Sequence, residues 1–438
     1  MKSKSIDRRP EIQAALVIHP TRHRDELLRV PAARLDEAIG LAQALDLDVR
    51  HGLIAPLRQA TPATLFGSGK VEEIGLQCQA DDIDVVVVDD SLSPVQQRNL
   101  ERAWKVKVID RTGMILEIFA RRARTREGKL QVELARLDYE RSRLVRTWTH
   151  LERQRGGFGV MGGPGETQIE SDRRLLAEKM ARLKKDLAEV GRTRGLQRQA
   201  RRRVPYPSIA LVGYTNAGKS TLFNRLTEAR VLAKDMLFAT LDPTMRQLRL
   251  PGGRPAILSD TVGFISDLPH ELVEAFRATL EEVRDADIVL HVRDIAGPDS
   301  DAQDEDVRKV LTEIGADAES GKRIVEVWNK IDMLDDESRA AVLERAQRQG
   351  AAAVSAVSGE GLDKLLALIS GLVDEGPDLV FDLASDDGEA LAWLYRHGRV
   401  VAREEAAGRL IVAARLSAQA LGRFERMRPK AHVQAAAE

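Results

Sequence analysis

The sequence predicts an α/β protein of four parts, and three observations lead to this fold class. Apolar runs alternate with helically spaced segments in residues 1–125. Two charged helical segments flank a glycine-rich break in residues 126–203, and a complete phosphate-loop motif lies between a strand pattern and a helix pattern in residues 204–373. We therefore expect a small parallel α/β domain, a long helical hairpin, a P-loop domain and, in residues 374–438, a small α+β module.

The composition narrows the class of protein. Of the 438 residues, 31% are charged and 4% aromatic. The single cysteine, Cys78, excludes an intramolecular disulfide and is typical of a reducing compartment. The charged N-terminus has no secretory signal, and the absence of 18 consecutive apolar residues predicts no membrane span. We expect a cytoplasmic monomer, with peripheral membrane association left open.

The N-terminal domain is predicted from apolar strands at residues 14–18, 85–88 and 106–109, with helical spacing at residues 35–45 and 71–78. The four-valine strand at 85–88 has no polar alternation, as expected for a strand covered on both faces of a parallel sheet. Strands that alternate with helices predict such a sheet.

A short motif in this domain, G-S-G-K at residues 67–70, is similar to part of a phosphate loop. However, Thr64 stands where the first glycine is required, and Val71 stands where Ser or Thr is required. We favour a turn that caps a helix, and a second nucleotide site is the alternative that stays open.

The hairpin is predicted from two apolar stripes at steps of three and four residues, the first of which Arg141 interrupts. They consist of Leu130, Leu134, Leu137, Leu144, Trp148 and Leu151, and of Leu176, Met180, Leu183, Leu187 and Val190. Residues 155–165 between them hold six glycines, so we expect an antiparallel pair with a glycine-rich tip and arms of about 22 residues each. Residues 121–203 carry 23 Lys and Arg against 11 Asp and Glu. This excess suits RNA phosphates, although a solvated helix face is the simpler alternative.

The C-terminal module is predicted from two short strands, at residues 400–403 and 409–414, with helical segments before and after them.

The phosphate loop is the most informative motif. Its glycines let the backbone approach phosphate closely, the lysine reaches the β- and γ-phosphates, and the serine hydroxyl binds Mg²⁺. Its residues are Gly213, Tyr214, Thr215, Asn216, Ala217, Gly218, Lys219 and Ser220.

A second motif selects the base. N-K-I-D follows an apolar run, and its aspartate carboxylate can accept two hydrogen bonds from guanine, for which adenine has no matching donors. Its residues are Asn329, Lys330, Ile331 and Asp332, and we expect Ser355, Ala356 and Val357 to pack their backbone against the guanine oxygen. GTP and GDP are therefore the predicted ligands.

Two further segments complete a P-loop GTPase domain. The first is predicted to reach the nucleotide through Phe238, Ala239, Thr240, Leu241 and Asp242, and the second, a D-x-x-G motif, through Asp260, Thr261, Val262 and Gly263. We expect Asp260 to help hold Mg²⁺ through water and the Gly263 amide to sense the γ-phosphate. Thr240 is our choice for the second Mg²⁺ ligand beside Ser220, and Thr244 is the rival.

These motifs together resemble the HflX family, ribosome-associated GTPases of the Obg–HflX group. The resemblance covers nearly the whole chain and rests on residues 66–74, 162–170, 213–220, 238–243 and 260–264. It implies a GTPase that binds the 50S ribosomal subunit and its rRNA, and that splits or rescues stalled ribosomes under stress. The alternative is a GTP-regulated rRNA-binding or assembly factor, or an RNA chaperone, in which hydrolysis is incidental.

The sequence departs from Ras-type GTPases after the D-x-x-G motif, where Phe264 replaces the glutamine that positions the attacking water. We therefore expect slow intrinsic hydrolysis that the ribosome accelerates, with Lys219, Asn216 and Gly263 as the catalytic residues. Similar GTPases use an asparagine at the position of Asn216 to bind K⁺, and a turn-stabilising role is the equal alternative.

Overall fold

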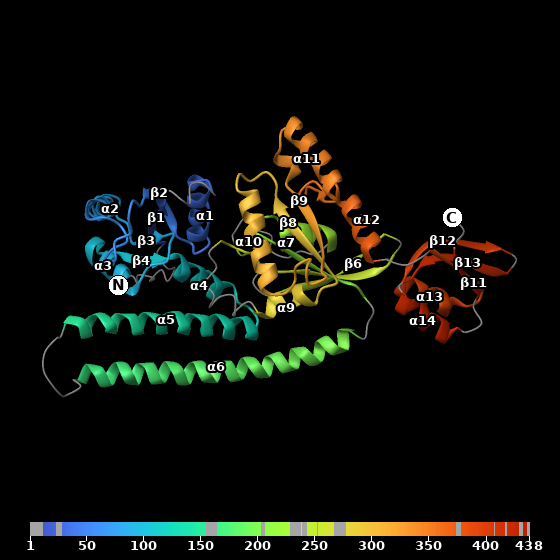
Figure 1. Cartoon of the computed structure of the whole chain (residues 1–438), viewed down its shortest axis with the longest axis horizontal. Coiled ribbons are helices and arrows are strands. Elements are labelled where there is room, and N and C mark those ends of the chain that lie inside the picture. Colours follow the sequence, from blue (N-terminus) through green and yellow to red (C-terminus); the bar gives the residue numbers. More distant parts are fainter. Residues whose placement is uncertain are drawn as a thin grey trace, which may run out of the picture. The chain divides into compact units, whose positions relative to one another are not determined.

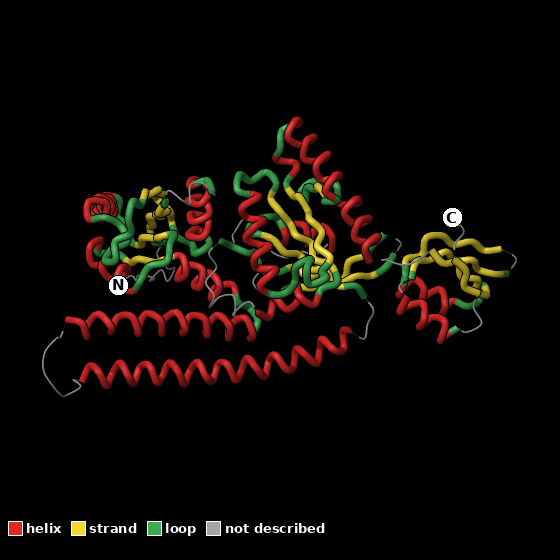
Figure 2. The backbone as a smooth tube through the Cα atoms, in the orientation of Figure 1, coloured by secondary structure: helices red, strands yellow, loops and turns green. Residues whose placement is uncertain are grey.

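The computed structural model describes residues 12–22, 29–154, 164–202, 206–227, 238, 243–251, 253–266, 277–373, 378–406, 408–416, 418–428 and 432–435. They include three β-sheets and two long helices (Figures 1 and 2). These residues form two compact units. The first unit holds the N-terminal sheet, the hairpin as far as Val190 and Phe238, and the second holds the remainder from Gly191 onward. The predicted division into four domains stays a prediction.

The N-terminal part is the predicted parallel α/β domain. Its strands are hydrogen-bonded in the order β2-β1-β3-β4, and every pair is parallel. Its elements are β1 (Ala14–Thr21), α1 (Pro31–Gln43), β2 (Asp48–Pro56), α2 (Ser68–Ala80), β3 (Val85–Val88), α3 (Pro94–Trp104), β4 (Lys107–Asp110) and α4 (Arg111–Arg122).

The predicted strands are confirmed as β1, β3 and β4, and the predicted helices as α1 and α2. Every residue of β3 is buried, as the four-valine run indicated. The G-S-G-K motif is confirmed as a helix start, because Gly67 is the N-cap of α2. Prediction missed β2, α3 and α4. β2 lies at the sheet edge with mostly exposed polar residues, so it lacks the apolar run that revealed the other strands.

The hairpin consists of α5 (Arg126–Gln154) and α6 (Pro164–Arg202). The side chains of Leu137, Met180 and Leu183 are buried together, with Leu130, Leu134 and Leu176 packed against them. This confirms that the two stripes pair in antiparallel order. The side chains of Leu144, Trp148 and Leu151, and the tip at 155–163, lie outside the described residues.

The predicted arm length was wrong, since α5 has 29 residues and α6 has 39. At 1.5 Å per residue these are about 44 and 58 Å long. The apolar stripes end early, but the Arg-, Lys- and Glu-rich segments beyond them favour helix, and Pro164 is tolerated because it is the first helical residue.

The second sheet lies in the predicted P-loop domain and has the order β10-β9-β8-β5-β7-β6, with β6 antiparallel to β7 and the other described pairs parallel. The elements of this part are β5 (Ser208–Gly213), α7 (Lys219–Thr227), β6 (Thr244–Arg249), β7 (Pro255–Asp260), α9 (Arg277–Asp285), β8 (Ile288–Asp294), α10 (Ser300–Glu313), β9 (Arg323–Asn329), η1 (Ile331–Met333), α11 (Asp336–Gln349), β10 (Ala352–Ala353) and α12 (Leu362–Val373).

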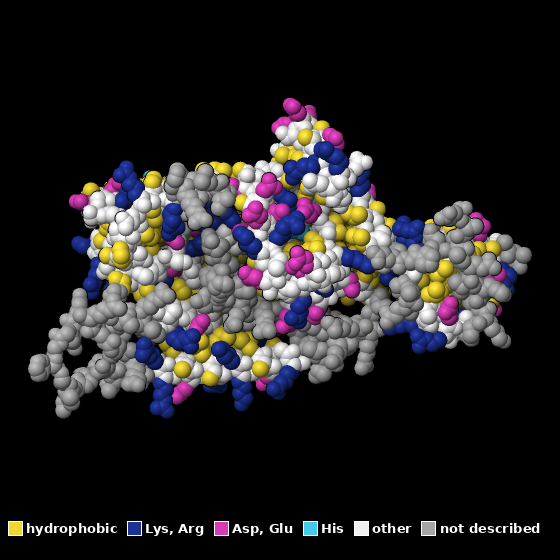
Figure 3. Space-filling view, viewed as in Figure 1, with side chains coloured by type: hydrophobic (Ala, Val, Ile, Leu, Met, Phe, Trp, Pro, Cys, Tyr) yellow, Lys and Arg dark blue, Asp and Glu magenta, His cyan; other side chains and the backbone are white. Residues whose placement is uncertain are grey.

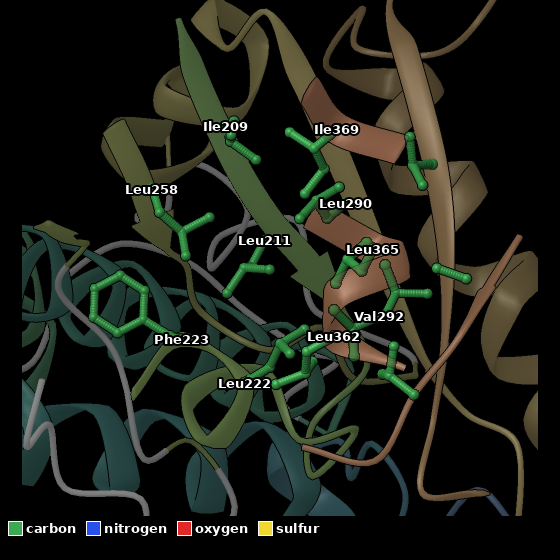
Figure 4. Close-up of a cluster of buried hydrophobic side chains, with 14 of the residues drawn as sticks. Ile209, Leu211, Leu222, Phe223, Leu258, Leu290, Val292, Leu362, Leu365 and Ile369 are labelled. Carbon is green, nitrogen blue, oxygen red and sulfur yellow. The ribbon is translucent and has the colours of Figure 1, made fainter. Parts of the chain in front are cut away.

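Apolar side chains from the strands and from α7 and α12 form the core beneath the phosphate loop (Figure 4). Leu211 and Leu290 come from neighbouring parallel strands, and Leu222 and Leu365 come from the helices that cover them. This core fixes the strand ends from which the site residues emerge.

The C-terminal part is an antiparallel sheet in the order β12-β13-β11-β14. Its elements are β11 (Asp378–Ala384), α13 (Gly388–His397), β12 (Arg399–Ala406), β13 (Arg409–Arg415), α14 (Ala418–Met427) and β14 (His432–Ala435). The two predicted strands are confirmed as β12 and β13, and β11 and β14 complete a β-α-β-β-α-β module. No helix among the described residues is both long enough and apolar enough to cross a membrane.

Candidate functional site

The phosphate loop follows β5, the strand that lies between β7 and β8 near the middle of the sheet. β5 ends at Gly213 and α7 begins at Lys219, so the loop lies at the carboxyl edge of the sheet, where ligands of such folds bind. Gly213 and Gly218 have φ of +149° and +92°. A Cβ on Gly213 would come within 2.1 Å of the Val292 carbonyl oxygen, so the loop cannot hold this path with a larger residue.

Lys219 is buried beneath this loop, with 6% of its surface exposed. Its Nζ donates to the carbonyl oxygens of Gly213 at 3.0 Å and Tyr214 at 2.6 Å. Burial lowers the pKa of Lys219 to about 8, partly offset by the Asp260 carboxylate. An anion bound beside Nζ would favour the charged form again, as a phosphate-binding lysine requires.

Ser220 and Asp260 form an oxygen-rich pair next to Lys219. Asp260 ends β7 and is fully buried, and its Oδ2 accepts a 2.7 Å hydrogen bond from Ser220 Oγ. A hydroxyl beside a carboxylate is a donor set that Mg²⁺ prefers. The neighbouring Thr261 hydroxyl donates instead to the Leu211 carbonyl oxygen at 2.5 Å, which fixes the start of the D-x-x-G segment to β5.

Gly263 brings the D-x-x-G segment against the phosphate loop. A Cβ there would lie 2.9 Å from Thr215 Cα and 3.0 Å from Lys219 Nζ. Both Val262 and Phe264 are buried, and Phe264 is only 3% exposed. A buried phenyl ring cannot orient water by hydrogen bonding. The position that holds a glutamine in Ras-type proteins therefore offers no hydrogen bond to the attacking water here.

Of the segment at residues 238–242, which is predicted to carry the second Mg²⁺ ligand, the structure describes only Phe238. Phe238 is buried, has φ of +56°, and packs edge-to-face on Phe119 of α4 with ring centroids 4.7 Å apart. Ala239, Thr240, Leu241 and Asp242 lie outside the described residues. The rival, Thr244, begins β6 directly opposite Asp260 in the strand ladder, so the choice between Thr240 and Thr244 stays open.

The base-selecting motif lies at the end of β9, beside the phosphate loop. Asn329 is buried, its Nδ2 donates to the Ala217 carbonyl oxygen at 2.8 Å, and its Oδ1 accepts from the Ala356 amide at 2.9 Å. Gly218 permits this approach, because a Cβ there would lie 2.2 Å from Asn329 Nδ2. Asn329 thus joins three of the predicted nucleotide-binding segments.

Among the other residues predicted to contact guanine, some side chains are exposed and others are buried. Asp332 lies in η1 and is exposed, so its carboxylate faces solvent at the edge where guanine is expected. Ile331 and Ser355 are buried, and Ser355 Oγ accepts from the Ser358 amide at 3.0 Å. Val357 is 72% exposed.

Sequence reasoning missed one charged partner of this motif. Asp294 ends β8, and its Oδ2 accepts a 2.7 Å hydrogen bond from Lys330 Nζ. Because neighbouring parallel strands end at one edge, a carboxylate at the carboxyl end of β8 was the signal that could have revealed it.

Comparison with known proteins agrees with this geometry. Four family models match successive parts of the chain: "GTP-binding GTPase N-terminal" at residues 32–120, "GTP-binding GTPase Middle Region" at 122–201, "50S ribosome-binding GTPase" at 208–330 and "HflX C-terminal domain" at 341–436.

Two curated relatives match over most of their length. The GTPase HflX of Magnetococcus marinus is 52% identical over 394 residues, which cover 89% of this chain and 90% of that protein. The GTPase HflX of Escherichia coli is 45% identical over 363 residues, covering 83% and 84%. A GTP-binding protein from Sulfolobus solfataricus, solved in complex with GDP, is 25% identical, covers 83% of this chain and 99% of that chain, and has a TM-score of 0.45.

Identity at this level over nearly the full length of both relatives settles the family, and the phosphate loop and base-selecting motif stand together in this chain at one edge of the sheet. The chain belongs to the HflX family of GTPases and is a GTP hydrolase.

Proposed function

We propose that this GTPase binds the large ribosomal subunit and uses GTP to split or rescue stalled ribosomes under stress. The observation that carries the proposal is the burial of Phe264, which leaves the D-x-x-G segment without a side chain to position water. Intrinsic hydrolysis is therefore slow, and a group from outside must accelerate it. The description of the family model that matches residues 208–330 supports the ribosome as that source.

The hairpin supplies the charge for contact with rRNA. Lys and Arg side chains lie along its described part (Figure 3). Several are engaged in ion pairs, such as Lys179 with Glu133 at 2.8 Å. By contrast, Arg182, Lys184 and Lys185 are exposed on α6 and can supply positive charge for phosphate.

Within the site, the phosphate-loop backbone and Lys219 hold the phosphates, Ser220 binds Mg²⁺, and Asp332 selects guanine. Ser220 would hold Mg²⁺, which would supply positive charge beside the phosphates, and Asn216 would hold K⁺ as a second positive charge. We further propose a cytoplasmic monomer, a state that sedimentation of the purified chain with and without nucleotide will test.

Sedimentation of ribosomes tests the main proposal directly. Mixing 70S ribosomes with the protein and a non-hydrolysable GTP analogue should convert the 70S peak into 50S and 30S peaks, with the protein in the 50S fraction. GTP hydrolysis should rise by at least about tenfold when 50S subunits are added. A 70S peak and a rate that both stay unchanged would contradict the proposal.

The basic surface has a matched test. Replacing Arg182, Lys184 and Lys185 with Ala should weaken binding to 50S subunits and flatten its dependence on salt, since each lost phosphate contact reduces the slope by about 0.7–0.9. The control replaces Lys309, Arg348 and Lys364, three exposed cations on α10, α11 and α12. Equal losses in both variants would indicate a general charge effect instead.

The glycine-rich tip separates the two candidate functions. Because α6 begins at Pro164, residues 156–163 can be exchanged for a short serine-rich linker without shortening either helix. Under the main proposal, this variant binds GTP but no longer splits ribosomes. If it splits them normally, or if RNA remodelling proceeds without any GTP, the RNA-chaperone or assembly-factor alternative is the better one.

A further inference from the structure

Hydrogen bonds between described residues join the phosphate loop to the segment that follows β7. The Thr215 amide donates to the Phe264 carbonyl oxygen at 2.7 Å, and the Phe264 amide donates to the Gly213 carbonyl oxygen at 3.0 Å. The third bond involves a side chain, because the Ser266 amide donates to the Tyr214 hydroxyl oxygen at 2.9 Å. The Tyr214 side chain is therefore the part of this connection that a substitution can alter.

Because Tyr214 and Ser266 are both buried, the loss of the hydrogen bond between them would be costly. Tyr214 is 3% exposed and Ser266 is 2% exposed. An amide at such a buried place is costly to leave without its acceptor, so loss of the hydroxyl would let the backbone around Ser266 move until it finds another one. Phenylalanine would keep the buried ring and remove only the oxygen.

The residue whose position depends on this connection is Gly263. It lies one residue before Phe264, and its backbone is so close to Thr215 and Lys219 that a Cβ would have contacts of 2.9–3.0 Å with both. The backbone pairing at Phe264 and the Tyr214 hydroxyl at Ser266 both fix the chain directly after Gly263. A displacement of about 1 Å at a reacting centre can slow a reaction on the order of a hundredfold.

We propose that Tyr214 is a positioning residue for GTP hydrolysis, whose hydroxyl fixes Ser266 and so keeps the Gly263 amide beside Lys219, where the γ-phosphate binds. This role belongs to the GTPase site alone and does not depend on the proposed ribosome function. GDP has no γ-phosphate, so the contribution of Tyr214 is specific to the triphosphate.

The test uses the full-length Tyr214→Phe variant without ribosomes. We expect kcat for GTP to fall about tenfold and affinity for a non-hydrolysable GTP analogue to fall about fivefold, as expected for one hydrogen bond, with affinity for GDP unchanged within about twofold. The matched control is Tyr395→Phe, at a residue of α13 that is 37% exposed. A purely structural role would weaken GDP and the GTP analogue alike, and that result, or an unchanged kcat, overturns the proposal.

A second measurement needs no variant. Hydrogen exchange of the Ser266 amide in the natural chain should slow by at least about tenfold when the GTP analogue replaces GDP, because the γ-phosphate stabilises the segment that Tyr214 holds. Equal exchange in the two complexes overturns the proposal even if Tyr214→Phe fails to fold.

Discussion

Asn329 is hydrogen-bonded to Ala217 at the carboxyl edge of the sheet. The side-chain amide of Asn329 donates to the Ala217 carbonyl oxygen at 2.8 Å. The same side chain accepts from the Ala356 amide at 2.9 Å. One buried amide therefore holds the phosphate loop, the end of β9 and the segment after β10 in a single arrangement. The asparagine of the base-selecting motif thus connects the segments of the candidate site, and we propose that the aspartate of that motif reads the base.

We predict that Asn329→Ala lowers the affinity for GTP and GDP by about a hundredfold, since it leaves a buried carbonyl and a buried amide without partners at a combined cost of about 2–4 kcal/mol. Titration with a fluorescent guanine nucleotide measures this. Asn99→Ala is the control, because Asn99 also donates to a backbone oxygen, of Ala63, but at an exposed position. A loss below threefold for Asn329→Ala would contradict the organising role.

Asp332→Asn is expected to reverse base preference. In the proposed site the carboxylate would accept from two guanine donors, and an amide cannot accept both, so GTP affinity should fall by at least about a hundredfold. Xanthosine triphosphate, whose base carries a carbonyl where guanine has an amino group, should bind the variant better than GTP does. Competition between the two nucleotides gives the ratio, and a retained preference for GTP would refute the assignment of Asp332.

Asn216 permits a clean separation of its two candidate roles. Its φ is +59°, a left-handed conformation that glycine adopts more easily than alanine does. If the side chain holds K⁺, both Asn216→Gly and Asn216→Ala should abolish the difference between GTP hydrolysis in K⁺ and in Na⁺. If the side chain only stabilises the turn, Asn216→Gly should hydrolyse GTP normally in either salt, and Asn216→Ala alone should lose about 1 kcal/mol of stability.

His291 should make the protein less stable in mild acid. Burial lowers its pKa from 6.5 to about 4, against the opposing effect of Asp304 and Glu326. The unfolded chain therefore binds a proton at a higher pH than the folded chain, so stability is complete above pH 6.5 and declines as the pH falls toward 4. The loss approaches about 3 kcal/mol at the lower limit.

Thermal unfolding at pH 7.5 and pH 5 measures this effect. The difference in Tm between these conditions should be smaller in His291→Gln than in the natural chain. His51→Gln serves as the control, because the His51 side chain is 48% exposed. Identical pH dependence in the natural chain and His291→Gln would show that other groups cause the acid sensitivity.

The extent to which sequence reasoning anticipated this structure depended on burial. Val85–Val88 was found to the residue because a strand covered on both faces must be apolar throughout. β2 was not predicted, because Asp48, Arg50 and His51 lie along an edge strand and break the apolar pattern. The Ser93 and Gln96 side chains make a capping box at the start of α3, a local signal that was present but unused.

The candidate site residues could be named from the sequence wherever short-range chemistry determines them. Close turns after β5, β7 and β9 carry motifs that each follow from the chemistry of phosphate, Mg²⁺ or guanine. The contacts of Lys330 with Asp294 and of Ser266 with Tyr214 connect residues 36 and 52 positions apart, and only the register of the strands brings them together. Such pairs are properties of the fold, and of these residues only Asp294, at the end of an apolar strand pattern, left a local signal in the chain.

The burial of Phe264 also has a temporal consequence. A GTPase that orients its own attacking water carries an internal timer, because the lifetime of its triphosphate state is fixed by its own rate of chemistry. A phenyl ring in that position cannot orient the water. Under the proposed function, the lifetime of the GTP-bound form would therefore be set by the time the protein takes to meet the large ribosomal subunit, and the GTP-bound form would mark a protein that has not yet met it.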